Sequence, residues 1–326
     1  MNRNTLLILF AGSLLLTVFA LWLNRPAEEQ TSELLLPGLD PALITEVQLH
    51  TAGNRQVAVL NRVVGNTDWV EGHTGYRANS RRISELLQAL TAAAKAEPKT
   101  RDQSYYDRLG LSAIEQPDAG GIAISLYAGN DIQGAVIAGD RIDGQQYARL
   151  RNDDRSWLLD RELTSARQQL DWLDQSLLDV PANRLARIEL QYDDGAVYVF
   201  NRDETASGGF TGDNYRLNRP AGSFLAALRL ESVHPAGHAD SLVTARFTTV
   251  DGLAVTATVS ANQDGYPVQF FAEHLAVDPA DGNLPDPAAV AAEAAAINER
   301  LGGWSYTLPA FKTELLLEKP ATLDAE

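Results

Sequence analysis

The feature that most constrains the fold is an internal repeat. The segment that starts at Thr45 is TEVQLHTAGNRQVAVLNR, and the segment that starts at Ala186 is ARIELQYDDGAVYVFNR. Farther along the chain, GYRANSRRISELLQAL aligns with NYRLNRPAGSFLAAL. The two copies are offset by about 140 residues, whereas a solenoid is built from many short repeats. The sequence therefore predicts two related modules in tandem.

Both copies open with a hairpin pattern. Alternating apolar residues flank Gly53-Asn54 in the first copy and Asp194-Gly195 in the second. Period-two alternation around such a turn is the sequence signature of a β-hairpin. We therefore expect each module to begin with two antiparallel strands.

A helix is predicted after the first hairpin. Its apolar residues fall on one helical face, namely Ile83, Leu86, Leu87, Leu90 and Ala94. Further strand-like runs follow in both copies, separated by glycine-containing turns. We therefore expect the α+β class, with each module built as a mostly antiparallel sheet packed with a helix.

The repeat also sets the expected module boundaries. The first module is predicted over residues 37–180 and the second over residues 181–320. Between the two copies, Glu162–Leu170 is predicted to be helical.

The second copy contains an insert at residues 278–301 that the first copy lacks. Its last part, Pro287–Leu301, is typical of a helix with Asp286 as N-cap and Pro287 at the first helical position. A function specific to the second copy is expected in such an insert. The alternative is that the insert covers an exposed sheet edge.

The start of the chain predicts a membrane anchor. Leu6–Leu23 is 18 residues long and carries no charge, and a helix of that length spans about 27 Å, close to the hydrocarbon thickness of a bilayer. Arg3 precedes the run, which favours a cytoplasmic N-terminus. We expect a single transmembrane helix at 6–23 in the inner membrane, a linker at 24–36 and the rest of the chain in the periplasm. The alternative is a cleaved signal peptide.

Charge and cysteine content exclude several classes of function. The chain has 27 Lys and Arg against 43 Asp and Glu, a formal net charge of −16. Nucleic acid is therefore not an expected partner, because phosphate neutralisation requires clustered cations. The chain has no cysteine, which excludes thiolate metal sites and cysteine nucleophiles.

No enzyme or cofactor signature is present. A P-loop, a dinucleotide-binding glycine motif, a nucleophile elbow and a zinc-protease motif are all absent from the sequence. We therefore expect no catalytic residues and no cofactor.

Two groups of residues have side chains that suit a metal ion. His234, His238 and Asp240 combine two imidazoles with a carboxylate, a set that binds zinc in other proteins; the alternative is a solvated loop. The loop 278–286 brings together four oxygen-bearing side chains, those of Asp278, Asp281, Asn283 and Asp286. Calcium binds such oxygens, but an ordinary turn cluster with a helix cap is the alternative.

One dipeptide recurs at matched positions of the two copies. Tyr76-Arg77 and Tyr215-Arg216 align with each other. Tyr and Arg are frequent anchors of protein interfaces, so a repeated interaction surface is one interpretation. The alternative is a structural corner between a strand and a helix.

Several local patterns occur together in a fixed order. They include LLLPGLDP at Leu34–Pro41, the motif Tyr106-Asp-Arg-Leu-Gly-Leu111 and the apolar junction Trp172–Leu178. With the N-terminal anchor, they resemble a bacterial family known only as a domain of unknown function. Its members are often encoded beside subunits of gliding-motility-type ABC transporters.

The resemblance implies a single-pass, envelope-facing accessory protein with tandem α+β modules, and it supplies no catalytic residues. We therefore expect a scaffold that binds transporter subunits or an envelope-assembly complex. The alternative is a cell-envelope hydrolase with a cleft between the two modules.

Overall fold

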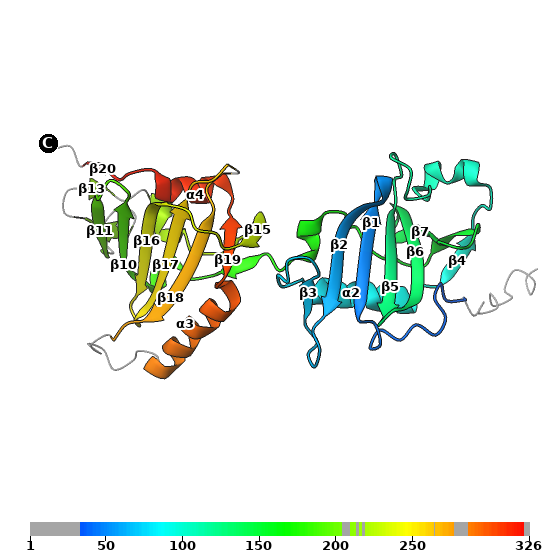
Figure 1. Ribbon diagram of the computed structural model, residues 1–326, viewed down its shortest axis with the longest axis horizontal. Coiled ribbons are helices and arrows are strands. Elements are labelled where there is room, and N and C mark those ends of the chain that lie inside the picture. The colour runs from blue at the N-terminus through cyan, green and yellow to red at the C-terminus, as the bar shows by residue number, and fades with distance from the viewer. Residues whose placement is uncertain are drawn as a thin grey trace, which may run out of the picture. The chain divides into compact units, whose positions relative to one another are not determined.

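Two antiparallel sheets of eight strands each dominate the computed structural model of this chain (Figure 1). The structure describes residues 33–203, 209–212, 215–216, 219–263, 265–276 and 286–322. Within these ranges no helix is long and apolar enough to cross a membrane. The predicted anchor at 6–23 lies outside the described residues. The α+β class predicted from the sequence is confirmed.

The first sheet has the strand order β3-β2-β1-β5-β6-β7-β8-β4. Its strands are β1 (Glu46–Thr51), β2 (Arg55–Arg62), β3 (Trp69–Glu71), β4 (Lys95–Pro98), β5 (Ile122–Ala128), β6 (Asp131–Ile142), β7 (Gln145–Leu150) and β8 (Ser156–Leu159). The predicted hairpin at Gly53-Asn54 joins β1 and β2 through the short 3-10 turn η1 (Ala52–Asn54). Both turn residues have positive φ, 70° for Gly53 and 54° for Asn54, a conformation that glycine and asparagine adopt most readily.

The second sheet has the strand order β12-β11-β10-β16-β17-β18-β19-β15. Its strands are β10 (Leu185–Tyr192), β11 (Val197–Arg202), β12 (Phe210–Thr211), β15 (Ser232–Pro235), β16 (Ser241–Thr249), β17 (Leu253–Ser260), β18 (Val268–His274) and β19 (Trp304–Thr307). Matched strand by strand, this is the order of the first sheet, which is the arrangement that the duplicated sequence predicts.

Two short pairs complete the strands of the described chain. β9 (Ser176–Leu178) pairs with β14 (Leu228–Arg229), and β13 (Tyr215–Arg216) pairs with β20 (Ala321–Thr322). The remaining 3-10 turns are η2 (Gln103–Tyr105), η3 (Asp107–Leu109), η4 (Gln169–Trp172), η5 (Ala182–Arg184) and η6 (Arg219–Ser223).

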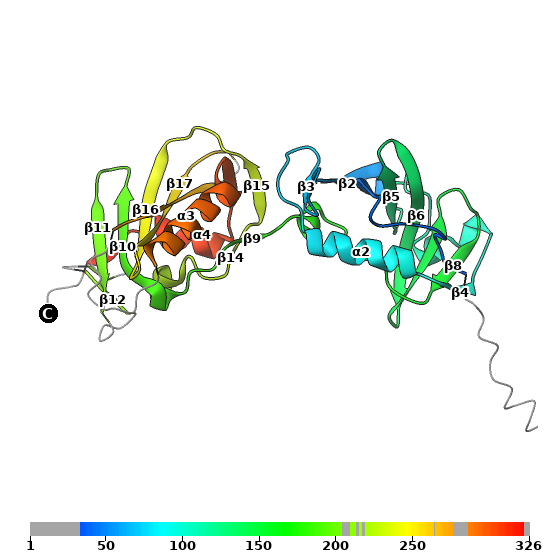
Figure 2. The ribbon, with the colours of Figure 1, turned by 90° about the horizontal axis from the view of Figure 1, so that it is seen from below.

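Two predicted helices form as expected. Helix α2 (Ser80–Ala92) lies across the strands of the first sheet (Figure 2) and buries Ile83, Leu86, Leu87 and Leu90. Helix α3 (Pro287–Leu301) packs against β18 and β17 of the second sheet. A third helix, α4 (Ala310–Leu317), contacts β16.

The second copy does not repeat α2. At the matched position it has only η6, and Gly222 within this segment has a low helix propensity. A Cβ atom on Gly222 would also lie 2.9 Å from the ring of Phe210. The helix of the second sheet is therefore supplied by the insert, as α3.

The helix predicted over Glu162–Leu170 is wrong, since the structure has only η4 in this region. The backbone N–H groups of Leu163 and Thr164 donate to the side-chain oxygen of Gln146 at 2.8 and 3.3 Å. The amide nitrogen of Gln146 donates to the carbonyl oxygen of Thr164 at 3.2 Å. A buried glutamine thus supplies the backbone partners that a helix would otherwise provide.

The end of the predicted linker belongs to the folded part. Leu34 forms a β-bridge with Ala94, and Leu35 is fully buried with its N–H donated to Ala93 at 2.8 Å. Residues 34–36 are therefore structural, and the linker predicted at 24–36 is too long.

The chain divides into two compact units. One runs up to Val59 and includes Arg81–Arg167; the other contains Leu60–Ser80 and everything from Gln168 onward. The repeat alone had placed a single boundary at 180/181. Residues 60–80 belong to the second unit because Tyr76 is fully buried in its core, with its ring 5.1 Å from that of Trp304.

Candidate functional site

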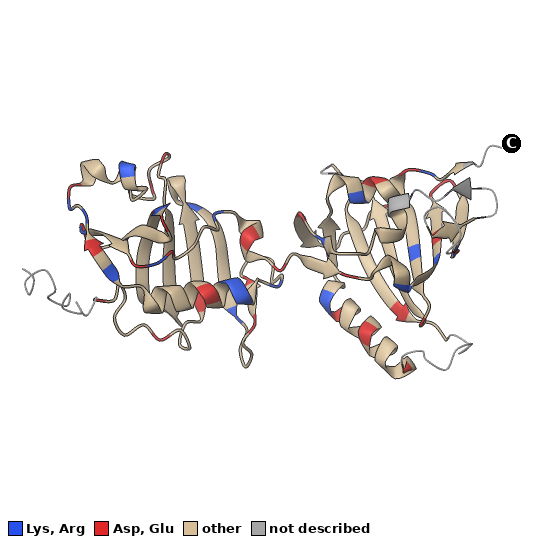
Figure 3. Ribbon diagram, turned by 180° about the vertical axis from the view of Figure 1, so that it is seen from behind, with Lys and Arg blue, Asp and Glu red and all other residues tan. Residues whose placement is uncertain are grey.

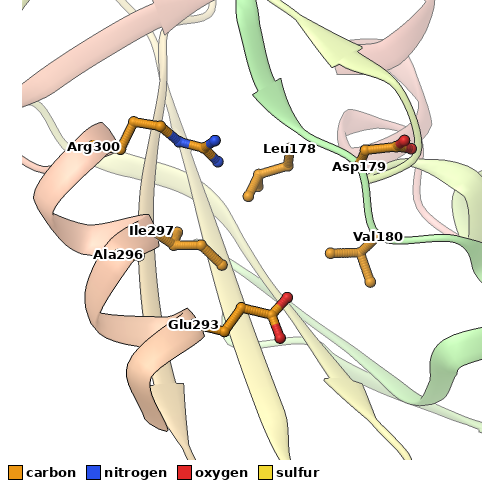
Figure 4. Close-up of a pocket in the computed structure, with 7 residues that line it drawn as sticks. All are labelled: Leu178, Asp179, Val180, Glu293, Ala296, Ile297 and Arg300. Atoms are coloured by element: carbon orange, nitrogen blue, oxygen red, sulfur yellow. The ribbon is translucent and has the colours of Figure 1, made fainter. Parts of the chain in front are cut away.

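The second unit contains a pocket of about 270 Å³ (Figure 4). It lies between α3 and the chain that leaves β9. Its lining residues are Leu178, Asp179, Val180, Glu293, Ala296, Ile297 and Arg300.

One wall of the pocket is a single face of α3. Glu293, Ala296, Ile297 and Arg300 are spaced by three or four residues, so their side chains project from the same side of the helix. The helix begins where the sequence predicts, because the carboxylate of Asp286 accepts the N–H of Ala288 at 3.0 Å. The position of this wall therefore depends on α3, whose N-terminus is capped by Asp286.

The opposite wall is the segment after β9. Leu178 and Val180 are buried, and the N–H of Val180 donates to the carbonyl oxygen of Leu225 at 3.1 Å. The carboxylate of Asp179 accepts the N–H of Ala227 at 2.8 Å, and Figure 4 shows it pointing away from the pocket. This wall presents aliphatic surface to the interior of the pocket.

The carboxylate of Glu293 is held by Arg184. The guanidinium donates to its two oxygens at 2.7 and 2.6 Å and also contacts Asp251 at 2.9 Å. Hydrogen bonds to Glu293, and then to Asp251, raise the pKa of Arg184 above its usual value. Burial alone would raise the pKa of Asp251, but hydrogen bonds from Thr249 and Arg184 hold that pKa below its usual range. Arg184 and Asp251 therefore stay charged and paired at neutral pH.

Arg300 differs from Arg184, because it has no carboxylate partner within the described residues. It donates one N–H to the carbonyl oxygen of Leu177. Its Nε atom is buried and has no hydrogen-bond partner among the residues that the structure describes. A buried guanidinium N–H without an acceptor is costly. Arg300 is thus a cation at the pocket with unused donor capacity.

The sequence predicts either an interaction surface or a structural corner at Tyr76 and Arg77. In the structure both residues contact Asp174 of the second unit. Tyr76 is fully buried and donates its hydroxyl to the carbonyl oxygen of Asp174 at 3.2 Å. Burial raises its pKa. Arg77 pairs with the carboxylate of Asp174 at 2.9 Å and lies over the Tyr76 ring at 5.8 Å. A buried ring cannot be an exposed contact, so this geometry fits the corner.

The matched pair in the second copy lies in a different place. Tyr215 and Arg216 form β13, which pairs with Ala321 and Thr322 of β20. The two dipeptides therefore do not occupy the same structural environment, although their sequences align.

The metal-binding candidates are not assembled into a site within the described chain. His234, His238 and Asp240 are exposed, and no cluster of three His, Cys, Asp or Glu side chains suited to a metal occurs among the described residues. Asp286 caps α3. The other three candidates of that loop, Asp278, Asp281 and Asn283, lie outside the described residues.

The sequence pointed to the insert but not to Arg300. The signal in the sequence is the helical spacing of Glu293, Ile297 and Arg300, which places these side chains on one face of α3, next to its buried residues. The facing wall, Leu178–Val180, is more than a hundred residues earlier in the chain, so no local pattern joins the two walls.

A family model described as a domain of unknown function, DUF4340, matches residues 69–248. The match begins at β3 and ends within β16, so it includes the β9 wall of the pocket but not α3. No curated protein matches the chain.

Proposed function

The chain belongs to the DUF4340 family, and we propose that it is a membrane-anchored accessory protein that faces the periplasm and acts by binding protein subunits. The partners that we propose are subunits of an ABC-type transport or envelope-assembly complex. The apolar run at 6–23 and the family resemblance support the anchor and the type of partner.

The pocket of the second unit supports binding, and not glycan hydrolysis, as the activity of this site. Hydrolysis of a glycan requires two carboxylates that are free to act as acid and base or nucleophile. Here both oxygens of Glu293 are engaged by Arg184, and Asp179 holds the backbone of Ala227. What remains is aliphatic surface beside one guanidinium, which suits recognition of another protein.

Site-specific photo-crosslinking in intact cells tests the proposed partner. A photoreactive residue at Ala296, which lines the pocket, is expected to give adducts with an ABC-type transporter subunit. The matched control places the same residue at Gln48 of the first sheet and is expected to give no such adduct. Adducts with neither a transport nor an envelope-assembly subunit would contradict the proposal.

Protease accessibility tests the proposed orientation. With residues 6–23 in place, the chain is expected to remain in the membrane fraction and to be digested when the periplasm is opened. Removal of residues 1–24 is expected to release it. Protection of the full chain in opened cells would place its bulk on the cytoplasmic side and overturn the orientation.

A further inference from the structure

We propose that the pocket between α3 and β9 binds the carboxyl-terminal residue of a partner protein, with a free carboxylate and an aliphatic side chain. The inference rests on the proposed function, since it names the part of the partner that the accessory protein recognises.

The unused donors of Arg300 are the first reason. Its Nε is buried without an acceptor, and its one described hydrogen bond goes to a neutral carbonyl at Leu177. A guanidinium binds a carboxylate through two parallel N–H donors. A ligand carboxylate in the pocket would accept from the terminal N–H groups of Arg300 and supply the missing countercharge, while the buried Nε stays out of its reach.

The neighbouring carboxylates do not cancel this attraction. Both oxygens of Glu293 accept hydrogen bonds from Arg184, at 2.7 and 2.6 Å, and not from Arg300, although Arg184 is shared with Asp251. Asp179 points out of the pocket (Figure 4) and caps the backbone at Ala227. Charged residues of both signs are spread over the elements of the chain (Figure 3). At this point Arg300 is the cation whose charge no described acidic side chain neutralises.

The walls of the pocket determine what the carboxylate is attached to. Leu178, Val180 and Ile297 are largely buried aliphatic side chains that line the space beside the guanidinium. They favour an aliphatic group through the hydrophobic effect. A polar sugar or a phosphate would leave this surface unmatched.

The size of the pocket suits about one residue of a ligand. Its volume is about 270 Å³, below the roughly 300–1,000 Å³ of sites that enclose drug-sized ligands. A leucine or valine side chain with its terminal carboxylate matches that space. The main chain before it would leave the pocket along the exposed alanines of α3, such as Ala292 and Ala296, where small side chains permit close approach.

Fluorescence anisotropy with the full chain in detergent tests the proposal. The probe is a hexapeptide labelled at its N-terminus that ends in leucine with a free carboxylate. The comparison peptide has the same sequence and a carboxyl-terminal amide. Loss of a charge-assisted contact predicts at least about tenfold weaker binding of the amide. Equal binding of the two peptides would overturn the proposal.

Two variants examine the two halves of the pocket. Arg300→Gln is expected to weaken binding of the free-carboxylate peptide about tenfold or more, and the matched control Arg187→Gln, on an exposed arginine of the same unit, to leave it unchanged. Arg300→Gln also loses the bond to Leu177. Ala296→Leu therefore serves as a second variant, because it fills the pocket while keeping Arg300 and a good helix former. Normal binding by both folded variants would overturn the proposal.

Competition separates a protein terminus from a small aliphatic acid. Octanoate and free leucine are expected to displace the labelled peptide at least tenfold less well than the unlabelled peptide does. Displacement by octanoate at the peptide's own concentration would assign the pocket to small acids and overturn the inference. If the peptide fails to bind while the Ala296 adduct with a transport subunit forms, the inference falls and the proposed function stands. The reverse outcome would overturn the proposed function alone.

Discussion

The two sheets have the same strand order, but their outer faces differ. In the first sheet the paired row His50, Ala123, Ile137 and Arg149 crosses β1, β5, β6 and β7. The matched row in the second sheet is Gln191, Thr244, Thr258 and Gln269. The central pair is apolar in the first sheet and polar in the second.

The length of one connection explains this difference. Between β4 and β5 the chain runs through residues 99–121, and Tyr106, Leu111 and Ile114 pack onto Ala123 and Ile137. Between β15 and β16 the matched connection is residues 236–240. Among the described residues this short connection provides no comparable cover, and Thr244 and Thr258 are partly exposed. Threonine is common in strands whose face meets solvent, whereas an exposed isoleucine adds no buried apolar surface. The sheet with the long connection thus has an apolar outer row, and the sheet with the short connection has a polar one.

The residues that hold the two connections have also diverged. Arg149 donates from Nε to the carbonyl oxygen of Leu111 at 2.9 Å. At the matched position, Gln269 donates to the carbonyl oxygen of Gly237 at 3.0 Å. In both copies the residue at this position of the sheet donates a hydrogen bond to the connection that precedes the central strands. The donor is the buried Arg149 in the first copy and Gln269 in the second.

The helices differ in a related way. In the first sheet β8 pairs along β7, whereas in the second β19 pairs with β18 only at Val268. Asn298 of α3 then accepts the N–H of Ala272 at 2.7 Å and donates to its carbonyl oxygen at 2.6 Å. The insert therefore covers the edge of β18 that β19 leaves free, which was the structural alternative for this segment.

The largest expected effect comes from exchanging the connections. Replacing residues 99–121 by the five residues of 236–240 exposes Ala123 and Ile137 and removes Tyr106, Leu111 and Ile114 from the core. At roughly 1.5–3 kcal/mol for each large apolar side chain, the loss is about 5 kcal/mol or more, comparable with the whole stability of a domain. We expect the exchanged chain to lose its cooperative unfolding transition in circular dichroism.

Adding Ala123→Thr and Ile137→Thr to the exchanged chain sharpens the comparison. These changes recreate the polar row of the second sheet, so soluble yield is expected to recover in part. An exchanged chain that unfolds like the parent, without these substitutions, would show that the 99–121 segment is not a cover.

Arg149→Gln is expected to have the next largest effect. It removes a buried charge-assisted hydrogen bond to Leu111 and a cation–π contact in which the guanidinium lies 4.9 Å from the Tyr106 ring. Together these are worth about 3 kcal/mol. Denaturant-induced unfolding measures the change. The reciprocal control, Gln269→Arg, is expected to cost less than about 0.5 kcal/mol because the second connection is exposed.

The hairpin that opens each sheet and the helices α2 and α3 were accessible from the sequence because they rest on local patterns. The apolar face of 83–90 and the cap at Asp286 are each read within a few residues. The cover of the first sheet was not accessible, because Tyr106 and Ile137 are far apart in the chain. The helix predicted at Glu162–Leu170 failed for the same reason, since Gln146 is what binds that backbone. Arg300 likewise became a site residue only when β9 was placed opposite α3.

A third prediction concerns β3 and β12, the matched edge strands of the two sheets, each of which begins with an aromatic residue. Arg62 lies over Trp69 in the first sheet, and Arg202 lies over Phe210 in the second. Two residues farther on, the first sheet has the buried Glu71. The second has Gly212, where a Cβ atom would lie 2.9 Å from the Phe200 ring.

Because Glu71 is an ionisable residue with a shifted pKa, its contribution to the stability of the first sheet depends on pH. Burial alone would raise that pKa, but hydrogen bonds from His73 and Thr74 hold it below its usual value. A depressed folded pKa contributes stability that is complete above about pH 4.5 and is lost as the pH falls through the folded value. Glu71→Gln is expected to cost about 2 kcal/mol at pH 7 and to flatten the loss of stability in acid. An unchanged acid profile would contradict this assignment.

The smallest expected effect is at Thr258, which stands in the second sheet where Ile137 stands in the first. Thr258→Ile restores the apolar residue on a face that no described segment covers, so the free energy of unfolding should change by less than about 0.5 kcal/mol. Urea-induced unfolding at two protein concentrations measures it. If the variant were instead stabilised by more than about 1 kcal/mol, and more strongly at the higher concentration, the outer face of the second sheet would be covered by another copy of the chain. The second sheet would then have an uncovered outer face only in the monomer, and the difference between the two sheets would disappear in the dimer.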